Sequence, residues 1–519
     1  MKNRDELIIF LLIIAIASFF RLYHIQSVPP GLYPDEAMNG NDAIQALESN
    51  HFKIFYPENN GREGLFIDLE AISIKFFGNT SWALRTVSAI TGIFTVIGLY
   101  LLAKQLFNSH IAGISSFLLA VSFWHVLFSR IGFRAIMAPL FIVWGFYFLW
   151  RGLRSSSVWD FILSGLCWGL GFYTYIAFRI IPLALFLVLI AYWQTIKKDF
   201  THSQYIHARI KLLKGLAALG ITALIITLPI LWYFYNNPQD FLGRTSQLSV
   251  FSSNTPLEDL GKNMVKTLGM FVISGDWNWR HNYAGEPELA WPVAALFAIG
   301  LLGSILKLRK SWRKHGHISA PQVLLLSWFF IGLIPVVISN EGIPHALRSV
   351  LVAPVAMLFA AQGLWWIFQF IDHRYRMQDV HEINVSMPLH HRLYLKESTL
   401  VSTTVIIIFL AAIGFAEFDK YFNRWATNPN VADAFSKRYS DIAQQINALP
   451  PSRYKYVVVN AEGILVNGIP MPAQTVMYLT DTWTPAKQKA KNIYYLTEEQ
   501  YKYRQYRQNG IVFSLEPRK

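Results

Sequence analysis

Residues 7–22 read LIIFLLIIAIASFFRL, and a short loop leads from them to Pro34-Asp35-Glu36-Ala37. The apolar run is long enough to cross the hydrocarbon core of a bilayer as a helix, because about 20 helical residues cover about 30 Å. Charged side chains in or beside hydrocarbon cost a few kcal/mol each and persist mainly where they pair or act. The acidic pair Asp35 and Glu36 at the end of this span is therefore the first candidate for a functional site.

The composition of the chain is typical of a polytopic membrane protein. Of its 519 residues, 53% are hydrophobic and only 15% are charged, which is too apolar for a soluble multidomain enzyme. Together with the first span, about eleven apolar runs reach membrane-spanning length. The others lie near residues 82–106, 111–129, 135–153, 158–178, 180–196, 213–235, 289–308, 321–339, 349–371 and 398–416.

The net charge of +14 invites a nucleic-acid interpretation, which requires basic and aromatic residues gathered in one soluble stretch. Many basic residues lie instead in loops between apolar runs, as in 197–198, 209–214, 307–314 and 374–376, which is typical of cytoplasmic loops. With the N-terminus inside, alternation of the spans places these loops in the cytoplasm. It places segments 23–81, 236–288 and the tail from about 417 outside. The first span lacks a small-x-small cleavage site, so we expect an uncleaved anchor in the plasma or inner membrane.

The tail differs in kind from the rest of the chain. Its pattern predicts an amphipathic helix over 431–449, a break at Pro450-Pro451, and short strands over 456–459, 475–479 and 511–515. We therefore expect an all-α membrane domain over 1–416 and a small extracytoplasmic α/β domain over 417–519. The lone cysteine, Cys167, excludes disulfides and cysteine metal cages within the chain.

Asp35 has the chemistry of a general base. One positioned carboxylate suffices to take a proton from an acceptor hydroxyl, and a pKa raised toward neutrality makes it more efficient. Glu36 next to it could supply that perturbation through its like charge. The alternative is that Pro34-Asp35-Glu36-Ala37 merely caps an interfacial helix over about 36–47.

Several arginines lie at the ends of spans that the topology places outside, against the positive-inside tendency. Arginine holds phosphate through a planar bidentate fork, so such a set suits an anionic lipid phosphate as the leaving group. The alternative is snorkelling to phospholipid headgroups. We favour Arg134 and Arg348, because Arg130 and His345 respectively lie at helical spacing from them. The set is Arg62, Arg85, Arg130, Arg134, Arg179, Arg244, Arg280 and Arg348.

The segment 275–282, Gly-Asp-Trp-Asn-Trp-Arg-His-Asn, mixes aromatic and hydrogen-bonding side chains, as sugar sites often do. Arg280 and His281 are candidates for a donor pocket, while the tryptophans are also typical of an interfacial aromatic belt. Mg²⁺ or Mn²⁺ on Asp35, Glu36 and His281 is conceivable, but no spacing indicates a metal, so we expect no required cofactor. Phosphate-loop, dinucleotide, zinc-protease and nucleophile-elbow motifs are absent, so the substrate must carry its own leaving group.

A set of motifs across residues 1–371 resembles one membrane enzyme family. These are Pro34-Asp35-Glu36-Ala37, then 61–66 (GREGLF) leading into Phe77-Gly78, 82–85 (WALR), 103–107 (AKQLF), Ser129-Arg130 and 344–348 (PHALR). Together they resemble the GT-C superfamily of membrane glycosyltransferases, in the branch of protein O-mannosyltransferases and aminoarabinose transferases. The resemblance implies a GT-C membrane domain with interfacial helices in the first outer loop.

The resemblance also implies roles for individual residues. The acidic residue of the first outer loop is the catalytic base in that family, so the base here is Asp35, supported by Glu36. The donor is a sugar on a polyprenyl phosphate, transferred with inversion. Relatives commonly carry Lys-Pro-Pro or His-Pro-Pro where this chain has Arg62-Glu63-Gly64. Because of this departure, the resemblance does not identify the acceptor or the donor headgroup.

The sequence thus predicts an inverting glycosyltransferase that moves a sugar from a polyprenyl-phosphate donor to a hydroxyl of a protein, lipid or polymer. The expected donor contacts are Arg62, Glu63, Arg134, Arg280, His281, His345 and Arg348. One alternative is a ligase or headgroup transferase that uses a diphosphate donor. Another is a lipid or sugar exporter, which the lack of fixed-period repeats and of paired broken helices disfavours.

Overall fold

The computed structural model describes residues 3–199, 202–241, 249–315, 318–381, 389–503 and 510–517. Helices occupy all eleven regions that the sequence predicts as spans, although α5 and α8 have only 13 and 14 residues. Within the described residues, seven are long and apolar enough to cross a membrane: α4, α7, α9, α10, α13, α14 and α15. The count of eleven spans therefore stays a prediction. The helices are α1 (Asn3–Leu22), α4 (Ser81–Leu106), α5 (Ser109–Val121), α7 (Met137–Ser155), α8 (Val158–Gly171), α9 (Pro182–Asp199), α10 (His202–Asn236), α13 (Trp291–His315), α14 (Ala320–Val337), α15 (Ala353–His381) and α16 (Leu389–Phe418).

One predicted span is interrupted. The run over 111–129 forms α5 and then a short helix α6 (Phe123–Phe128), with the chain bent at Ser122. The backbone N–H of Phe123, which the break leaves without a helical partner, donates to the Glu417 carboxylate at 2.7 Å. A side chain distant in sequence thus supplies the hydrogen-bond acceptor that the break in the helix requires. No pattern within 111–129 predicts this break.

The first loop, residues 23–81, folds into two helices and a hairpin. α2 (Pro34–Ser49) begins with Pro34 in its first turn and confirms the helix predicted over about 36–47. Strands β1 (Phe55–Tyr56) and β2 (Arg62–Glu63) pair antiparallel, and α3 (Leu65–Phe77) follows. The turn between the strands holds Asn59, Asn60 and Gly61 at φ 54°, 62° and 80°. Asn and Gly tolerate this left-handed backbone best, so these residue types form the turn.

Short elements connect the later helices. They are η1 (Arg134–Ile136), η2 (Ile176–Ile180), η3 (Val250–Ser252), α12 (Pro256–Gly269) and η4 (Val350–Val352). The irregular segments 270–290 and 338–349 lie beside each other, because the Ala346 backbone N–H donates to Asp276 at 2.9 Å. This contact brings two predicted site segments together.

The tail forms the predicted α/β module, with corrections. Its sheet is parallel with the order β6-β3-β7. The strand predicted over 475–479 is wrong, because this segment is a helix whose buried face packs on α2, so tertiary packing outweighs β-propensity. The helix predicted over 431–449 divides at Ser436, which has φ 52°. The elements are η5 (Asp419–Trp425), α17 (Pro429–Ala434), α18 (Lys437–Asn447), β3 (Lys455–Val459), β4 (Leu465–Val466), β5 (Ile469–Pro470), η6 (Met471–Ala473), α19 (Gln474–Thr480), α20 (Pro485–Lys491), β6 (Ile493–Thr497), α21 (Glu498–Tyr503) and β7 (Ile511–Ser514).

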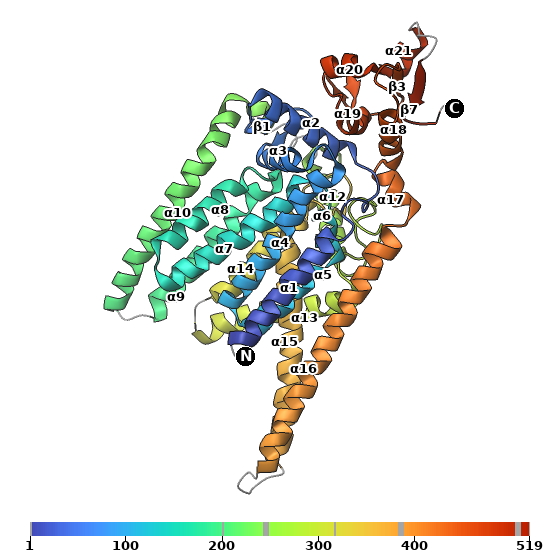
Figure 1. Cartoon of the computed structure of the whole chain (residues 1–519). Helices are drawn as coiled ribbons and strands as arrows, with labels where there is room; N and C mark the ends of the chain where they lie inside the picture. The colour runs from blue at the N-terminus through green and yellow to red at the C-terminus, as the bar shows by residue number, and fades with distance from the viewer. Residues whose placement is uncertain are drawn as a thin grey trace.

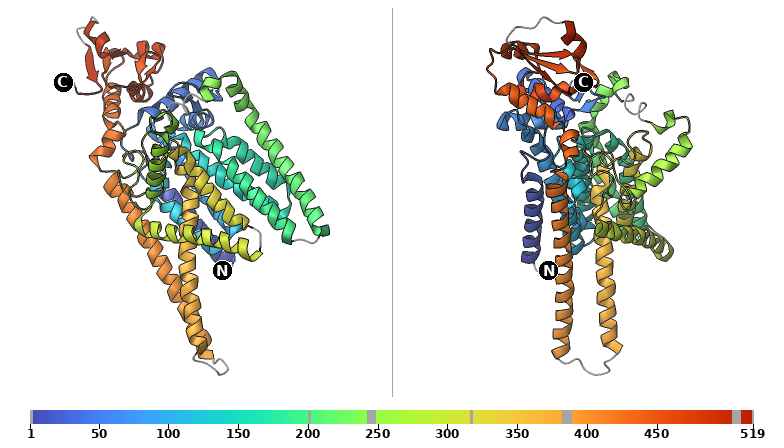
Figure 2. Two further views of the ribbon diagram at one scale, coloured as in Figure 1. Left: turned by 180° about the vertical axis from the view of Figure 1, so that it is seen from behind. Right: turned by 90° about the vertical axis from the view of Figure 1, so that its right-hand side faces the viewer.

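Helix α19 fixes the module onto the first loop. Gly40 of α2 lies against the Tyr478 ring, and the Tyr478 hydroxyl donates to the Thr80 carbonyl at 3.2 Å. The Asn41 side-chain amide donates to the Gln474 side chain at 2.8 Å, also across this interface. Both views show the module and the first loop at one end of the helix bundle, with the N-terminus toward the other end (Figures 1 and 2).

Candidate active site

A cavity of about 340 Å³ lies at the end of the bundle that carries the first loop. We call it the arginine cavity, because four arginine side chains line it. Its walls come from the first loop, η1, the segment 270–290 and the segment 338–349. The lining residues are Tyr33, Asp35, Asn39, Asn59, Asn60, Arg62, Phe133, Arg134, Ala135, Tyr175, Asp276, Asn278, Arg280, His281, Glu341, Gly342, His345, Leu347 and Arg348.

Asp35 reaches this cavity from the first turn of α2. Its carboxylate accepts a hydrogen bond from the Asn59 side-chain amide at 3.0 Å. Asn59 belongs to the left-handed turn of the hairpin, so the turn holds the amide that orients the carboxylate. The side chain is half-buried, which leaves room for a hydroxyl to approach it.

Glu36, one residue later, points away from the cavity and is fully buried. Arg85 donates to both of its carboxylate oxygens, at 3.0 and 3.1 Å, and the Gly132 backbone N–H donates at 2.7 Å. The Tyr33 N–H donates at 3.3 Å and so closes the cap of α2. With all these donors engaged, Glu36 anchors the helix that presents Asp35. The charge of Glu36 adds to burial in raising the pKa of the adjacent Glu70 well above its usual range.

Two of the arginines already have carboxylate partners. Arg62 donates to Asp42 at 2.5 Å and to Asn39 at 2.8 Å. Arg134 donates to Glu63 at 2.8 Å, and Arg179 lies 3.4 Å from the other oxygen of the same carboxylate. Glu63 therefore does not line the cavity itself. It holds Arg134 at the wall and neutralises part of its charge.

The other two arginines have more charge available. Among the described residues, no carboxylate lies within ion-pair distance of Arg280, whose guanidinium stacks 3.8 Å from the Tyr33 ring centre. Burial lowers the pKa of Arg280 to about 10, so it stays positive at neutral pH. Arg348 bonds to Ser339 and to the Glu341 carbonyl, and its nearest carboxylate, the exposed Glu341, is 3.7 Å away. An anionic ligand in this cavity would meet two largely uncompensated guanidinium groups.

Asp276 organises the opposite wall. Its carboxylate accepts from His281 Nδ1 at 3.0 Å, from the Asn278 N–H at 2.8 Å and from the Ala346 N–H at 2.9 Å. His345 stacks on His281 with ring centres 4.8 Å apart. Burial lowers the pKa of His281, an effect that the Asp276 hydrogen bond opposes.

The same three side chains are also the candidate metal ligands of the described part of the chain. One ligand atom each from Asp276, His281 and His345 lie within 4.8 Å of one another. Two imidazoles and a carboxylate suit Zn²⁺ or Mn²⁺ better than Mg²⁺. This set shares only His281 with the trio that the sequence suggested, since Glu36 is engaged by Arg85.

The structure brings most of the predicted site residues into one cavity. Asp35, Arg62, Arg134, Arg280, His281, His345 and Arg348 all line it, whereas Glu36 and Glu63 lie behind its wall. Of the other arginines, Arg85 and Arg130 are fully buried and bond to backbone carbonyls, and Arg244 lies outside the described residues.

The sequence analysis does not predict several residues that line the cavity. Asn59 and Asn60 had a signal, because Asn-Asn-Gly is typical of a left-handed turn, but nothing in the pattern connects that turn to Asp35. Asp276 lay in a segment already singled out, although its carboxylate was not predicted to organise the wall. Asn39 and Tyr175 carried no signal of their own.

The sequence is similar to known proteins over part of its length. The family model for dolichyl-phosphate-mannose-protein mannosyltransferases matches residues 69–233. A putative mannosyltransferase, YkcB of Bacillus subtilis (strain 168), is 26% identical over 208 residues, which cover 38% of this chain and 28% of that protein. The chain thus matches less than a third of the length of this curated relative.

Solved structures show the same fold. ArnT from Cupriavidus metallidurans in the apo state superposes with a TM-score of 0.56 at 14% identity, covering 93% of this chain and 85% of that one. ArnT bound to undecaprenyl phosphate gives a TM-score of 0.53 at 14% identity, covering 95% and 90%. The Archaeoglobus fulgidus oligosaccharyltransferase tethered to an acceptor peptide gives 0.53 at 15% identity, covering 94% and 64%.

The fold is that of the ArnT structures, which are membrane glycosyltransferase-like in their helical architecture. Over residues 69–233 the sequence is similar to the dolichyl-phosphate-mannose-protein mannosyltransferase family. A second, weaker likeness is to a putative mannosyltransferase.

Proposed function

We propose that this protein is an inverting glycosyltransferase that moves a sugar from a polyprenyl-phosphate donor to an acceptor hydroxyl. The observation that carries the proposal is the position of Asp35, which faces a cavity together with four arginine side chains. A carboxylate for the acceptor and cations for the departing phosphate are the two groups that this reaction needs.

The reaction proceeds in one displacement. The acceptor oxygen attacks the anomeric carbon of the sugar while the bond from that carbon to the phosphate oxygen breaks. Asp35 takes the proton of the acceptor hydroxyl, and the bonding electron pair leaves with the phosphate. Arg280 and Arg348 stabilise the negative charge that grows on the departing oxygen, which lowers the barrier because the charge is largest in the transition state.

A lipid carrier fits the position of the cavity. Seven of the described helices are long and apolar enough to cross a membrane. The cavity lies beside the first loop at one end of these helices, where a prenyl chain in the membrane can bring its phosphate. The similar ArnT fold has been solved with undecaprenyl phosphate, which supports a carrier of this class. We propose that this end of the bundle faces outward, where nucleotide sugars are not at hand.

We propose that the transfer requires no divalent metal. Asp276, which would be the carboxylate ligand of a metal, already accepts hydrogen bonds from His281 and two backbone N–H groups. We expect the purified protein to keep its transfer rate in excess EDTA. A rate abolished by EDTA and restored by Mn²⁺ or Zn²⁺ would assign Asp276, His281 and His345 to a metal instead.

The decisive test is Asp35→Asn. The amide keeps the size and the Asn59 contact of the side chain but is no base, so we expect transfer to fall about 10²–10⁴-fold while donor binding persists. Asp433→Asn, an exposed change on α17, is the control. The measurement is transfer of labelled sugar from a polyprenyl phosphate in reconstituted vesicles.

Three results would replace the proposal. A wild-type rate of sugar transfer by Asp35→Asn would show that Asp35 is not the catalytic base. Activity on a diphosphate donor alone would favour a polymer ligase or headgroup transferase. Altered lipid export in Asp35→Asn, without any effect on sugar transfer, would favour an exporter whose acidic residue gates transport.

A further inference from the structure

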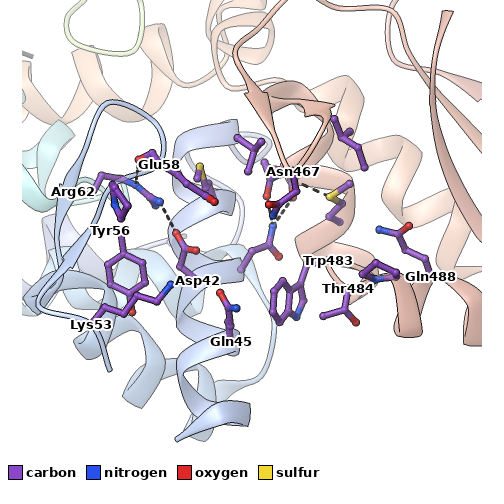
Figure 3. A pocket seen from close by; sticks show the side chains of 18 residues that line it. Asp42, Gln45, Lys53, Tyr56, Glu58, Arg62, Asn467, Trp483, Thr484 and Gln488 are labelled. Carbon is purple, nitrogen blue, oxygen red and sulfur yellow. Dashed lines mark hydrogen bonds and ion pairs between the residues drawn. The ribbon is translucent and has the colours of Figure 1, made fainter. Parts of the chain in front are cut away.

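A second cavity, of about 370 Å³, lies between the first loop and the C-terminal module. We call it the interdomain pocket. In Figure 3 the first loop, with Asp42, Gln45 and Tyr56, forms one wall, and the module, with Trp483 and Gln488, forms the other. Arg62 lines both this pocket and the arginine cavity, so the two are neighbours.

The lining of the interdomain pocket combines neutral amides with aromatic rings. Amides donate and accept hydrogen bonds equally well, and an aromatic face packs against apolar C–H groups. This mixture matches a sugar ring, which has hydroxyls around its rim and C–H bonds on its faces. The amides are Asn41, Gln45, Asn467, Gln474 and Gln488, and the rings are Tyr56 and Trp483.

Two polar groups beside this pocket lack protein partners. Among the described residues, the Trp483 indole N–H and the Asn41 carbonyl oxygen are buried without a hydrogen bond, and both residues line the pocket. An unsatisfied buried group costs about 1–3 kcal/mol, so a ligand that brings hydroxyl groups to this wall would be stabilised.

The charges of the interdomain pocket are balanced, unlike those of the arginine cavity. Arg62 is paired with Asp42, and the remaining cation, Lys53, shares the lining with Glu58. A neutral ligand is therefore favoured over an anionic one. An extended peptide is less suited, because the only strands that line the pocket, in the β1–β2 and β4–β5 hairpins, are two residues long and offer short edges.

We propose that the interdomain pocket binds a neutral pyranose unit of the acceptor. This inference rests on the proposed glycosyl transfer, whose acceptor it narrows to a glycan or glycolipid. A pyranose held between α2 and the module places its neighbouring unit past Arg62, toward Asp35. The C-terminal module then serves as the second wall of an acceptor site.

The test is binding of neutral sugars to the full-length protein in nanodiscs. The probes are methyl pyranosides of glucose, galactose, mannose and N-acetylglucosamine, detected by saturation-transfer NMR. We expect at least one to bind, and Gln45→Ala and Gln488→Ala each to weaken it fivefold or more. Their side-chain amides make no hydrogen bond to another described residue, so removing them spares the fold. Gln445→Ala, an exposed amide on α18, is the matched control.

The outcomes separate this inference from the proposed function. No binding by any pyranoside, equal binding by Gln45→Ala, Gln488→Ala and wild type, or displacement of the sugar only by a neutral peptide would each overturn the sugar site. If Asp35→Asn loses transfer but the wild-type protein binds none of the pyranosides, the proposed function is supported and the sugar site is not. A third outcome is that Gln45→Ala abolishes sugar binding while Asp35→Asn transfers sugar at the wild-type rate. This result would support the sugar site and show that Asp35 is not the catalytic base.

Discussion

At the scale of single residues, the four arginines of the cavity differ in the charge they offer a ligand. Asp42 and Glu63 neutralise much of the charge of Arg62 and Arg134, respectively. Arg280, in contrast, has no carboxylate within ion-pair distance in the described structure. The sequence analysis favours Arg134 and Arg348 as phosphate ligands, because helical spacing identifies residues that are neighbours along the chain. Salt-bridge partners from other segments decide which guanidinium is available, and spacing does not show them.

This difference predicts unequal effects on donor binding. Arg280→Ala and Arg348→Ala should each weaken binding of a polyprenyl phosphate about 10–100-fold, because a hydrogen bond to a charged group contributes about 1.5–3 kcal/mol. Arg134→Ala should have a smaller effect, since Glu63 already occupies that guanidinium. The measurement is a titration in nanodiscs, with Arg154→Ala, an exposed change at the end of α7, as the control. Unchanged affinity in both Arg280→Ala and Arg348→Ala would remove the phosphate site.

At the scale of elements, the contact between α2 and α19 joins the first loop to the C-terminal module. Gly40 permits this contact, because a Cβ built on it would lie 2.4 Å from the Tyr478 ring. The same helix presents Asp35 to one cavity and Gln45 to the other. The geometry of both proposed sites therefore depends on how closely these two helices approach.

We expect Gly40→Ala to destabilise the protein by about 1–3 kcal/mol, because an added methyl group must displace a buried ring. Its apparent melting temperature should fall by roughly 1 °C for each kcal/mol, because the entropy of unfolding grows with chain length. Gly261→Ala in α12 is the control, since nothing lies within 4 Å of its added Cβ. A melting temperature for Gly40→Ala equal to that of wild type would show that the ring moves aside at no cost.

At the scale of the whole molecule, the first loop and the C-terminal module lie at one end of the helix bundle (Figures 1 and 2). Residues of the first loop line both cavities. The basic loops between apolar runs predict a cytoplasmic position for the other end. The proposed chemistry requires the cavities to face outward, so the orientation of the molecule is itself testable.

The single cysteine makes that test direct. In a Cys167→Ala background, Lys489→Cys on α20 should react with a membrane-impermeant maleimide in intact cells, and Lys310→Cys on α13 should not. Both should react after permeabilisation, because both side chains are exposed. Labelling of Lys310→Cys alone in intact cells would reverse the topology and contradict the proposed function.

The membrane class, the positions of most helices, the helix over 36–47 and the choice of Asp35 as a candidate can all be predicted from the sequence. These follow from local signals, namely apolar length, helix-start residues and a charge beside hydrocarbon, which need no knowledge of distant contacts. The family resemblance added the role of Asp35 as a base.

Which charged groups lie together depends on how distant segments pack in the folded protein. Glu36 is adjacent to Asp35 in sequence but turns to Arg85, since successive side chains on a helix point in different directions. Asp276 and His345 meet because two irregular segments pack side by side, and residues 475–479 are helical because they pack on α2. Contacts between segments far apart in the chain set these features, and no local pattern encodes such contacts.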